Sequence, residues 1–266
     1  MNQEIKQLSF IYSFDMSKEI ADFTHMPEEA QASAETSAVK VIYESFVVPG
    51  DEDYLLSRLL AQKGLERGFY WAASQAIEKY LKALLLMNGE SVKKFKKHPL
   101  KELFKAATNI DTSLLSLDIS PHPSIQVEDD ISQYIKKYSI QQLIEELEKH
   151  GDADNRYNAF GVEYNTGHLF AMDSLSFQLR GKIGVIPIGE TLKRISPDLI
   201  ITFEKCNPWF STKENLLPIS LPSKDFSIQD SISVTQLDIL IKNKSNPAYS
   251  LALQWLDAKM KIPKLE

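Results

Sequence analysis

The chain has 266 residues, enough to bury a sizeable core as one large domain or two modest ones. Hydrophobic residues make up 43% and charged residues 25%, both ordinary for a globular protein, and the 10 glycines disfavour a fold built on many tight turns or a glycine-rich phosphate loop. The 30 lysines and arginines against 36 aspartates and glutamates give a formal charge of -6, which argues against broad, salt-driven nucleic-acid binding.

The single cysteine, Cys206, excludes an intrachain disulfide and a metal site built from several cysteines. The N-terminus has no long apolar run followed by a small-residue cleavage site. The longest apolar stretch, Leu81–Met87, is interrupted by Lys82 and is far shorter than the roughly 20 residues that span a membrane. We therefore expect a cytoplasmic protein that does not enter the membrane.

The first fifty residues read as an N-terminal extension. Pro27–Ala38 is small and polar, which favours either a short exposed helix or a linker. Val39–Val48 is rich in β-branched and aromatic residues and ends at Pro49-Gly50, which predicts a strand.

From Asp51 the hydrophobic period becomes helical. The acidic run at residues 51–53 suits a helix N-terminus, and leucines then recur at helical spacing. A stronger apolar stripe runs from Phe69 to Leu85 and predicts a long helix that stops at Asn88-Gly89. Glu78 and Lys82 are four residues apart, which predicts a surface ion pair on the opposite face.

Three more helices are predicted before residue 181. His98-Pro99 opens the first, and the capping box Ser139 to Gln142 opens the second, which Gly151 ends. Thr166 caps the third, which Gly181 closes. Several helices joined by loops predict an antiparallel bundle over residues 51–181.

Residues 182–266 form a C-terminal extension with a different sequence pattern. Val185–Ile188 and Asp198–Phe203 read as short strands or extended segments, and Thr235–Ile241 is ambiguous. Asn246-Pro247 precedes a helical pattern that predicts a terminal helix. The predicted fold is therefore mainly α, a helical bundle with short extended segments in the N- and C-terminal extensions.

The segment Phe69–Leu86 (FYWAASQAIEKYLKALLL) resembles the HEPN superfamily. A helix in that family reads A-x-x-x-A-x-E-K-x-L-K-A-L-L and precedes an H-x-L segment, here His98 to Leu100. The pair Arg156-Tyr157 resembles an Arg-Tyr pair found before the last long helix. The resemblance covers about residues 51–181. It implies an up–down helical bundle, a homodimer, and a role connected with nucleotides or RNA.

HEPN domains include metal-independent ribonucleases, toxin–antitoxin components, and non-catalytic partners of minimal nucleotidyltransferases. The catalytic members carry an Arg-x(4–6)-His motif, in which the arginine stabilises phosphate charge and the histidine transfers a proton. Here eleven residues separate Arg156 from His168, the nearest approach to that motif. The catalytic residues are therefore unassigned, and this departure from the catalytic motif favours a binding role.

The candidate ligand site combines Arg156, Tyr157, His168 and His98. Thr166 would place His168 in the first turn of a helix, where backbone N–H groups attract anions. Arg156 could fold back toward the same place, and His98 at another helix start would complete a phosphate-binding corner. The alternatives are plain ones: His98 caps its helix, Arg156 pairs with a nearby aspartate, and His168 faces the core.

Tyr157, Tyr164 and Tyr70 could stack on a base or simply belong to the core. No phosphate-loop, zinc-protease or nucleophile-elbow motif occurs, and five histidines on separate segments do not predict a metal site. We expect neither a metal nor a cofactor.

Three hypotheses remain open. The first is a binding module for a nucleotide, a nucleic acid or a partner enzyme such as a nucleotidyltransferase. The second is a metal-independent ribonuclease or toxin-like protein with a displaced Arg/His pair. The third is a purely structural, dimerising protein.

Overall fold

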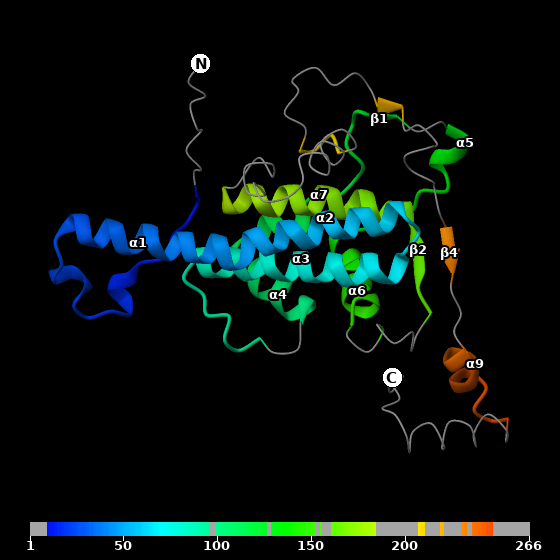
Figure 1. Ribbon diagram of the computed structural model, residues 1–266, viewed down its shortest axis with the longest axis horizontal. Helices are drawn as coiled ribbons and strands as arrows, with labels where there is room; N and C mark the ends of the chain where they lie inside the picture. Colours follow the sequence, from blue (N-terminus) through cyan, green and yellow to red (C-terminus); the bar gives the residue numbers. More distant parts are fainter. Residues whose placement is uncertain are drawn as a thin grey trace.

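The computed structural model describes residues 10–95, 99–126, 129–152, 155, 161–184, 207–210, 219–220, 230–232 and 236–246. Most of these residues are helical (Figure 1), so the fold is mainly α, as predicted. The α-helices are α1 Glu28–Ile42, α2 Val48–Gln62, α3 Glu66–Met87, α4 Leu100–Ile110, α5 Asp129–Ser132, α6 Ile140–His150, α7 Thr166–Ile183 and α9 Gln236–Lys242. The tighter or wider helical turns are η1 Met16–Lys18, η2 Phe23–His25, the π-helix η3 Tyr43–Val47 and η4 Thr112–Ser116.

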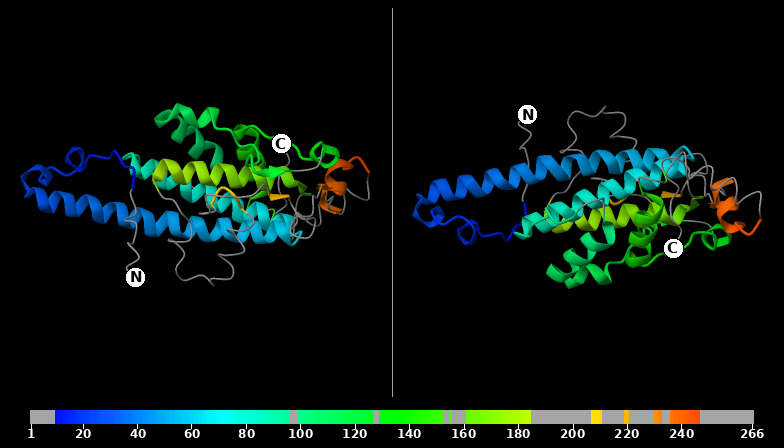
Figure 2. Two further views of the ribbon diagram at one scale, coloured as in Figure 1. Left: turned by 90° about the horizontal axis from the view of Figure 1, so that it is seen from above. Right: turned by 90° about the horizontal axis from the view of Figure 1, so that it is seen from below.

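The bundle is built around α3, which contacts α2, α4, α6 and α7. The turn between Gln62 and Glu66 joins α2 and α3 into a hairpin. Figures 1 and 2 show α1 extending beyond one end of the bundle, with the chain before it running back alongside. The side chains that fill the bundle core come mainly from α3 and α7.

Residues 39–48 form a helix, so the predicted strand is wrong. α1, η3 and α2 follow one another without a break, and the predicted boundary after residue 50 lies inside this continuous helix. Val39 is 3% exposed whereas Val41 is 61% exposed. A strand would direct both side chains to one face, but a helix turns them about 200° apart. The β-branched composition suggested a strand, and the packing of a helical face overrode that preference.

Pro49-Gly50 lies in the first turn of α2 and does not end an element, as the sequence had suggested. Just before it, the N–H of Val48 donates across the wider π turn to the carbonyl of Tyr43. The wider turn accommodates the proline, which lacks a donor and crowds the preceding turn of a regular helix. A Cβ on Gly50 would come within 2.9 Å of the Tyr80 ring. The glycine therefore allows the close approach of α2 and α3.

α3 confirms the long helix predicted from its apolar stripe. Its buried side chains include Phe69, Tyr70, Ala73, Ala76, Ile77, Tyr80 and Leu81. Asn88 caps its C-terminus and Gly89 follows with a positive φ of 78°, as the sequence indicated. The interpretation of Glu78 as a surface residue was wrong, because it is 5% exposed. Its carboxylate lies 2.5 Å from Nζ of the half-buried Lys82.

Two buried ion pairs join α2 to α7. Nε and Nη2 of Arg180 donate to the two carboxylate oxygens of Asp51 at 2.8 and 3.0 Å, and both side chains are fully buried. Nε of Arg58 lies 2.8 Å from Oδ1 of Asp173, and these side chains are 3% and 4% exposed. The acid belongs to α2 in the first pair and to α7 in the second, so the two pairs have opposite polarity.

The segment Asn207–Phe210 packs on these buried charges. Nδ2 of Asn207, itself fully buried, donates to the Tyr54 hydroxyl at 2.8 Å. That hydroxyl donates in turn to Oδ1 of Asp173 at 2.5 Å. The Phe210 ring lies 5.5 Å from the guanidinium carbon of Arg180. Part of the C-terminal extension is therefore integral to the bundle core.

The helix ends test the predicted boundaries of α6 and α7. The capping box of α6 is confirmed, because Ser139 and Gln142 exchange side-chain and backbone bonds, and Gly151 ends the helix. α7 begins at Thr166, but its N-cap is Asn165 rather than Thr166 itself. It also runs past the predicted end at Gly181 to a left-handed Gly184, φ 87°.

Extended structure is sparse among the described residues. β1 Ile125–Gln126 pairs in parallel with β3 Ile219–Ser220, and β2 Glu163–Asn165 pairs antiparallel with β4 Asp230–Ile232. α9 resolves the ambiguous stretch around residues 235–241 as helix. The extended segments predicted at residues 185–188 and 198–203, and the terminal helix after residue 246, lie outside the described residues.

Candidate functional site at the start of α7

Asn165 shapes the N-terminus of α7. Its side-chain oxygen accepts from the N–H of Gly167 at 2.8 Å, and its own N–H donates to Nδ1 of His168 at 3.2 Å. This is a capping box in which a histidine fills the place of the usual Glu or Gln. The same Asn165 side chain binds the preceding loop, accepting from the N–H of Lys136 at 3.0 Å and donating to the Tyr134 carbonyl at 2.8 Å.

His168 lies in the first turn of α7 and is 2% exposed. The Tyr138 ring stacks on the imidazole with centroids 4.1 Å apart and planes inclined by 28°. The Tyr70 hydroxyl is 3.1 Å from Nδ1 and donates its proton to the Glu163 carbonyl at 2.6 Å. The loop around residues 134–138, β2 and α3 thus all contribute to one aromatic cage around the imidazole.

The two ring nitrogens of His168 differ in their contacts. Nδ1 lies 3.2 Å from both the N–H and the carbonyl oxygen of Asn165; in the tautomer that accepts from this N–H, the proton is on Nε2. Nε2 is buried and has no hydrogen-bond partner among the described residues. A buried donor without an acceptor costs about 1–3 kcal/mol. In that tautomer the start of α7 holds one N–H group that an acceptor on a ligand could satisfy.

Burial lowers the pKa of His168 to about 4, and the nearby Glu146 carboxylate only partly opposes the shift. The imidazole is consequently neutral at pH 7. It offers a hydrogen bond and an aromatic face, but no positive charge for a phosphate.

Glu146 and His150 on α6 lie near enough to the imidazole for their charges to act on it. Oε2 of Glu146 lies 2.9 Å from Nε2 of His150, and this contact lowers the pKa of the Glu146 carboxyl. The Glu146 side chain is 33% exposed, whereas His150 is buried with its ring 4.9 Å from that of Tyr70. Glu146 is therefore the partly open edge of an otherwise enclosed cluster.

Of the predicted site residues, the structure describes only His168. Its place in the first turn of a helix is as predicted, and it also faces the core, as the plainer alternative held. His98, Arg156 and Tyr157 lie outside the described residues. Tyr70 and Tyr164 are buried at 0% and 2% exposure, consistent with the core interpretation of these rings.

Tyr138, Glu146 and His150 were not identified from the sequence. Tyr138 directly precedes the capping box at Ser139, and Glu146 and His150 are four residues apart on α6. The i,i+4 spacing of a carboxylate and a histidine was the available signal, since it places both on one helix face. Nothing in the sequence showed that this face would meet α7.

The described residues contain no group of three or more His, Cys, Asp or Glu side chains placed to hold a metal ion. None of the described helices is long and apolar enough to cross a membrane. What the cluster presents is the unpartnered Nε2 of His168, stacked aromatic rings and one carboxylate that accepts hydrogen bonds.

Comparison with known proteins finds no match to a family model, to a curated protein or to a solved structure.

Proposed function

We propose that the chain is a HEPN-like, non-catalytic binding module that recognises a nucleotide or nucleic acid at the start of α7. The observation that carries the proposal is the buried Nε2 of His168, which has no hydrogen-bond partner among the described residues. The helical bundle is compatible with the resemblance of α3 to the HEPN superfamily.

A nucleobase fits the chemistry of this cluster. A base offers ring-nitrogen or carbonyl acceptors for the His168 N–H, amino groups for the Glu146 carboxylate, and a π face for the tyrosine and histidine rings. Stacking contributes about 1–3 kcal/mol per base. The half-buried Tyr138 is the ring that a base could displace or stack upon, because its neighbours are more deeply enclosed.

The phosphate of such a ligand requires a different set of groups. His168 is neutral at pH 7, and Glu146 places negative charge beside it. Arg156 and His98 are the residues we propose for the phosphate, on the strength of the sequence alone. The ligand would then extend from the aromatic cluster toward these two side chains.

The low pKa of His168 favours binding over catalysis. A general acid or base works best when its pKa is near the operating pH, and His168 is about three units away at pH 7. A metal-independent ribonuclease with a displaced Arg/His pair therefore ranks second. It requires a bound substrate to raise this pKa.

Exposed apolar side chains favour the third alternative, a dimerising protein. Leu56 and Leu59, one helical turn apart on α2, are 45% and 36% exposed, and Leu65 in the following turn is 55% exposed. These leucines are the proposed homodimer contact. Light scattering of the wild type and of Leu56→Glu with Leu59→Glu tests this contact independently of any ligand.

The experiment that tests the proposed function is a thermal-melt screen against nucleotides and short RNAs. A ligand at about 100 times its dissociation constant adds roughly 2.7 kcal/mol to the free energy of unfolding. We expect His168→Ala and Arg156→Ala to lose this shift, and His25→Ala, exposed on η2, to retain it. Absence of a shift with every nucleotide and RNA would refute the proposal. RNA cleavage without metal, abolished in Arg156→Ala, would support the ribonuclease instead.

A further inference from the structure

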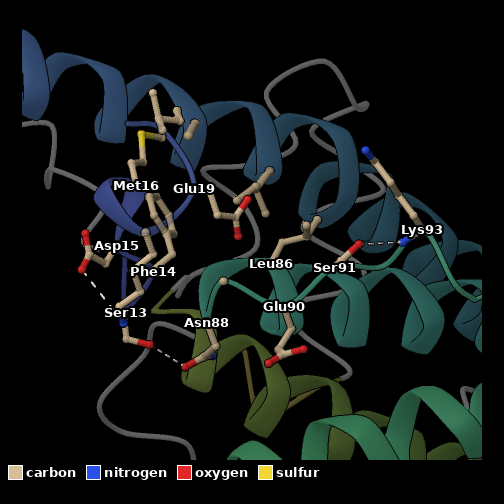
Figure 3. A pocket seen from close by; sticks show the side chains of 15 residues that line it. Ser13, Phe14, Asp15, Met16, Glu19, Leu86, Asn88, Glu90, Ser91 and Lys93 are labelled. Carbon is tan, nitrogen blue, oxygen red and sulfur yellow. Dashed lines mark hydrogen bonds and ion pairs between the residues drawn. The ribbon is translucent and has the colours of Figure 1, made fainter. Parts of the chain in front are cut away.

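A cavity of about 560 Å³ lies at the other end of α3 (Figure 3). Its walls come from the N-terminal segment 13–20, from Ala38 and Ile42 of α1, and from the chain at 86–93 where α3 ends. Tyr70, in the proposed nucleotide site, is 16 residues before Leu86 on α3, which corresponds to about 24 Å along the helix. The two sites are therefore separate.

Hydrogen bonds hold the N-terminal wall of this cavity in place. The Ser13 N–H donates to the Met87 carbonyl at 2.8 Å, and the Ser13 hydroxyl donates to Oδ1 of Asn88 at 2.8 Å. Two residues earlier, the Ile11 N–H donates to the Ile183 carbonyl at 3.0 Å. The segment is thus attached to the C-terminal ends of both α3 and α7. The cavity is formed before any ligand arrives.

The floor of the cavity is apolar. Phe14, Ile42 and Leu86 line it, and Met16 adds a polarisable thioether (Figure 3). Phe14 and Ile42 pack against the main hydrophobic core, and the Phe14 ring stacks on Tyr12 with centroids 4.9 Å apart. Pockets for small organic molecules have volumes of roughly 300–1,000 Å³ and mostly apolar walls. This cavity falls within that class.

Two carboxylates border the apolar floor without an ion-pair partner among the described residues. The side chains of Glu19 and Glu90 make no ion pair or hydrogen bond with any residue that the structure describes. Asp15 differs, because it accepts from the N–H and hydroxyl of Ser17 at 3.0 and 2.6 Å and lies 4.0 Å from Nζ of Lys18. Glu19 follows η1 and Glu90 follows α3, so the two free carboxylates come from separate walls.

We propose that this cavity binds an organic cation, an ammonium group carried on an apolar body of about the size of a phenylethyl group. The apolar body covers Leu86, Ile42 and the Phe14 ring, and burial of its surface contributes roughly 25 cal/mol per Å². The ammonium is attracted by the negative charges of Glu19 and Glu90 and by the face of the Phe14 ring. A metal ion does not fit this floor, because hard cations require six or more oxygen ligands.

The charge of Lys93 distinguishes two classes of ligand, a simple cation and a zwitterion. It lines the rim of the cavity, and its ammonium has no partner among the described residues. A zwitterionic ligand would pair its carboxylate with Lys93, whereas a simple cation is repelled by it. The proposal therefore predicts that neutralising Lys93 leaves binding unchanged or strengthens it.

The test is an amide NMR titration of the full chain with three probes that share one apolar body: 2-phenylethylammonium, 2-phenylethanol and 3-phenylpropionate. We expect the ammonium to shift the amides of Phe14, Gly89 and Glu90, and to bind about tenfold more tightly than the alcohol, a difference of about 1.4 kcal/mol. The propionate should not bind. Raising the salt concentration should weaken the ammonium alone.

The matched variants are Glu19→Gln with Glu90→Gln, Lys93→Gln, and Glu102→Gln as a control on the exposed face of α4. All four positions are exposed, and an unchanged melting temperature verifies folding. The double variant should lose the preference for the ammonium over the alcohol, while the Glu102 control keeps it. Equal affinity for ammonium and alcohol, weaker binding in Lys93→Gln, or no amide shift at about 10 mM of any probe would overturn the proposal.

Discussion

Asp51 of α2 and Arg180 of α7 form a two-bond carboxylate–guanidinium pair that is wholly removed from solvent, although 129 residues separate them in the chain. The Tyr80 hydroxyl of α3 donates a third bond to the same carboxylate at 2.7 Å. One buried aspartate therefore joins α2 to both α3 and α7, the two helices that supply most of the core. Removing these charges from water costs free energy, and their mutual attraction offsets that cost only when every partner is present.

Removing one partner of this pair should be far more damaging than removing both. Asp51→Asn leaves the Arg180 charge buried without a counter-ion, and we expect a loss of about 3–5 kcal/mol in the free energy of unfolding. Asp51→Leu combined with Arg180→Met removes both charges and should recover most of that loss. Denaturant unfolding measures both changes.

The control is Lys101→Gln, which removes only the ion pair with Glu148, in which the Lys101 and Glu148 side chains are 59% and 28% exposed. An exposed pair of this kind contributes less than about 1 kcal/mol. If Asp51→Asn costs no more than this control, the buried pair does not specify the bundle.

The hydrogen bond from Asn207 to Tyr54 should couple the C-terminal extension to α2. We expect Asn207→Ala to destabilise the protein by about 1–3 kcal/mol, because the buried Tyr54 hydroxyl loses a donor partner. In a Tyr54→Phe background the same substitution should cost less, with a coupling energy of about 0.5–3 kcal/mol. Strict additivity in this double-mutant cycle would show that the two side chains are independent.

Gly167 allows the loop before α6 to reach the start of α7. A Cβ at this position would overlap the Lys136 carbonyl and come within 2.9 Å of the Asn165 side-chain oxygen. We therefore expect Gly167→Ala to destabilise the protein by about 1–3 kcal/mol through overpacking, although alanine normally stabilises a helix by about 1 kcal/mol relative to glycine.

The displaced loop should also carry Tyr138 away from His168. The imidazole proton resonances report this movement, because the stacked ring shifts them. Ala171→Gly is the control: it exchanges the same two residue types in the same helix but leaves the contact between Gly167 and Lys136 intact. A Gly167→Ala protein as stable as wild type, with unchanged imidazole shifts, would contradict the close contact.

The stability of the protein should fall as the pH is lowered from 6.5 toward 4. Burial lowers the pKa of His168 from its ordinary 6.5 to about 4, so in this range the unfolded chain binds a proton that the native protein does not. The free energy of unfolding then decreases by about 3 kcal/mol over the full interval. His168→Asn keeps a cap acceptor but removes this titration.

The stability difference between wild type and His168→Asn should therefore shrink as the solution is acidified, measured by urea unfolding at several pH values. Glu146 is present in both proteins, and its lowered pKa also reduces stability at low pH, so only the difference isolates the histidine. A difference that stays constant from pH 7 to 4 would mean that His168 titrates as in the unfolded chain.

The local features of the fold were predictable from the sequence. The capping box at Ser139, the stop at Asn88-Gly89 and the apolar stripe of α3 each depend on residues within a few positions of one another. The strand predicted at residues 39–48 was wrong because β-branched composition is a weak local preference, which burial on a helical face outweighed. The fold class was therefore predictable wherever the spacing of the apolar residues identified a helix.

The buried network was not predictable, because its contacts join distant residues. Asp173 and Arg180 occupy otherwise apolar positions of α7, and Asp51 and Arg58 do so on α2. Their seven-residue spacing on each helix was visible, but their pairing was not. The same reason explains the candidate site: His168 was identified from its helix start, whereas Tyr138 and Glu146 reach it only through the tertiary fold.

The opposite polarity of the two buried pairs selects one alignment of α2 with α7. Acid and base are seven residues apart on each helix, in an order that matches only when the helices are antiparallel and in register. A slip of two turns in one direction would bring Asp51 against Asp173, and in the other it would bring Arg58 against Arg180. Each misaligned bundle would bury two like charges against each other. Repulsion therefore destabilises these alternative registers, while attraction within the ion pairs stabilises the native one.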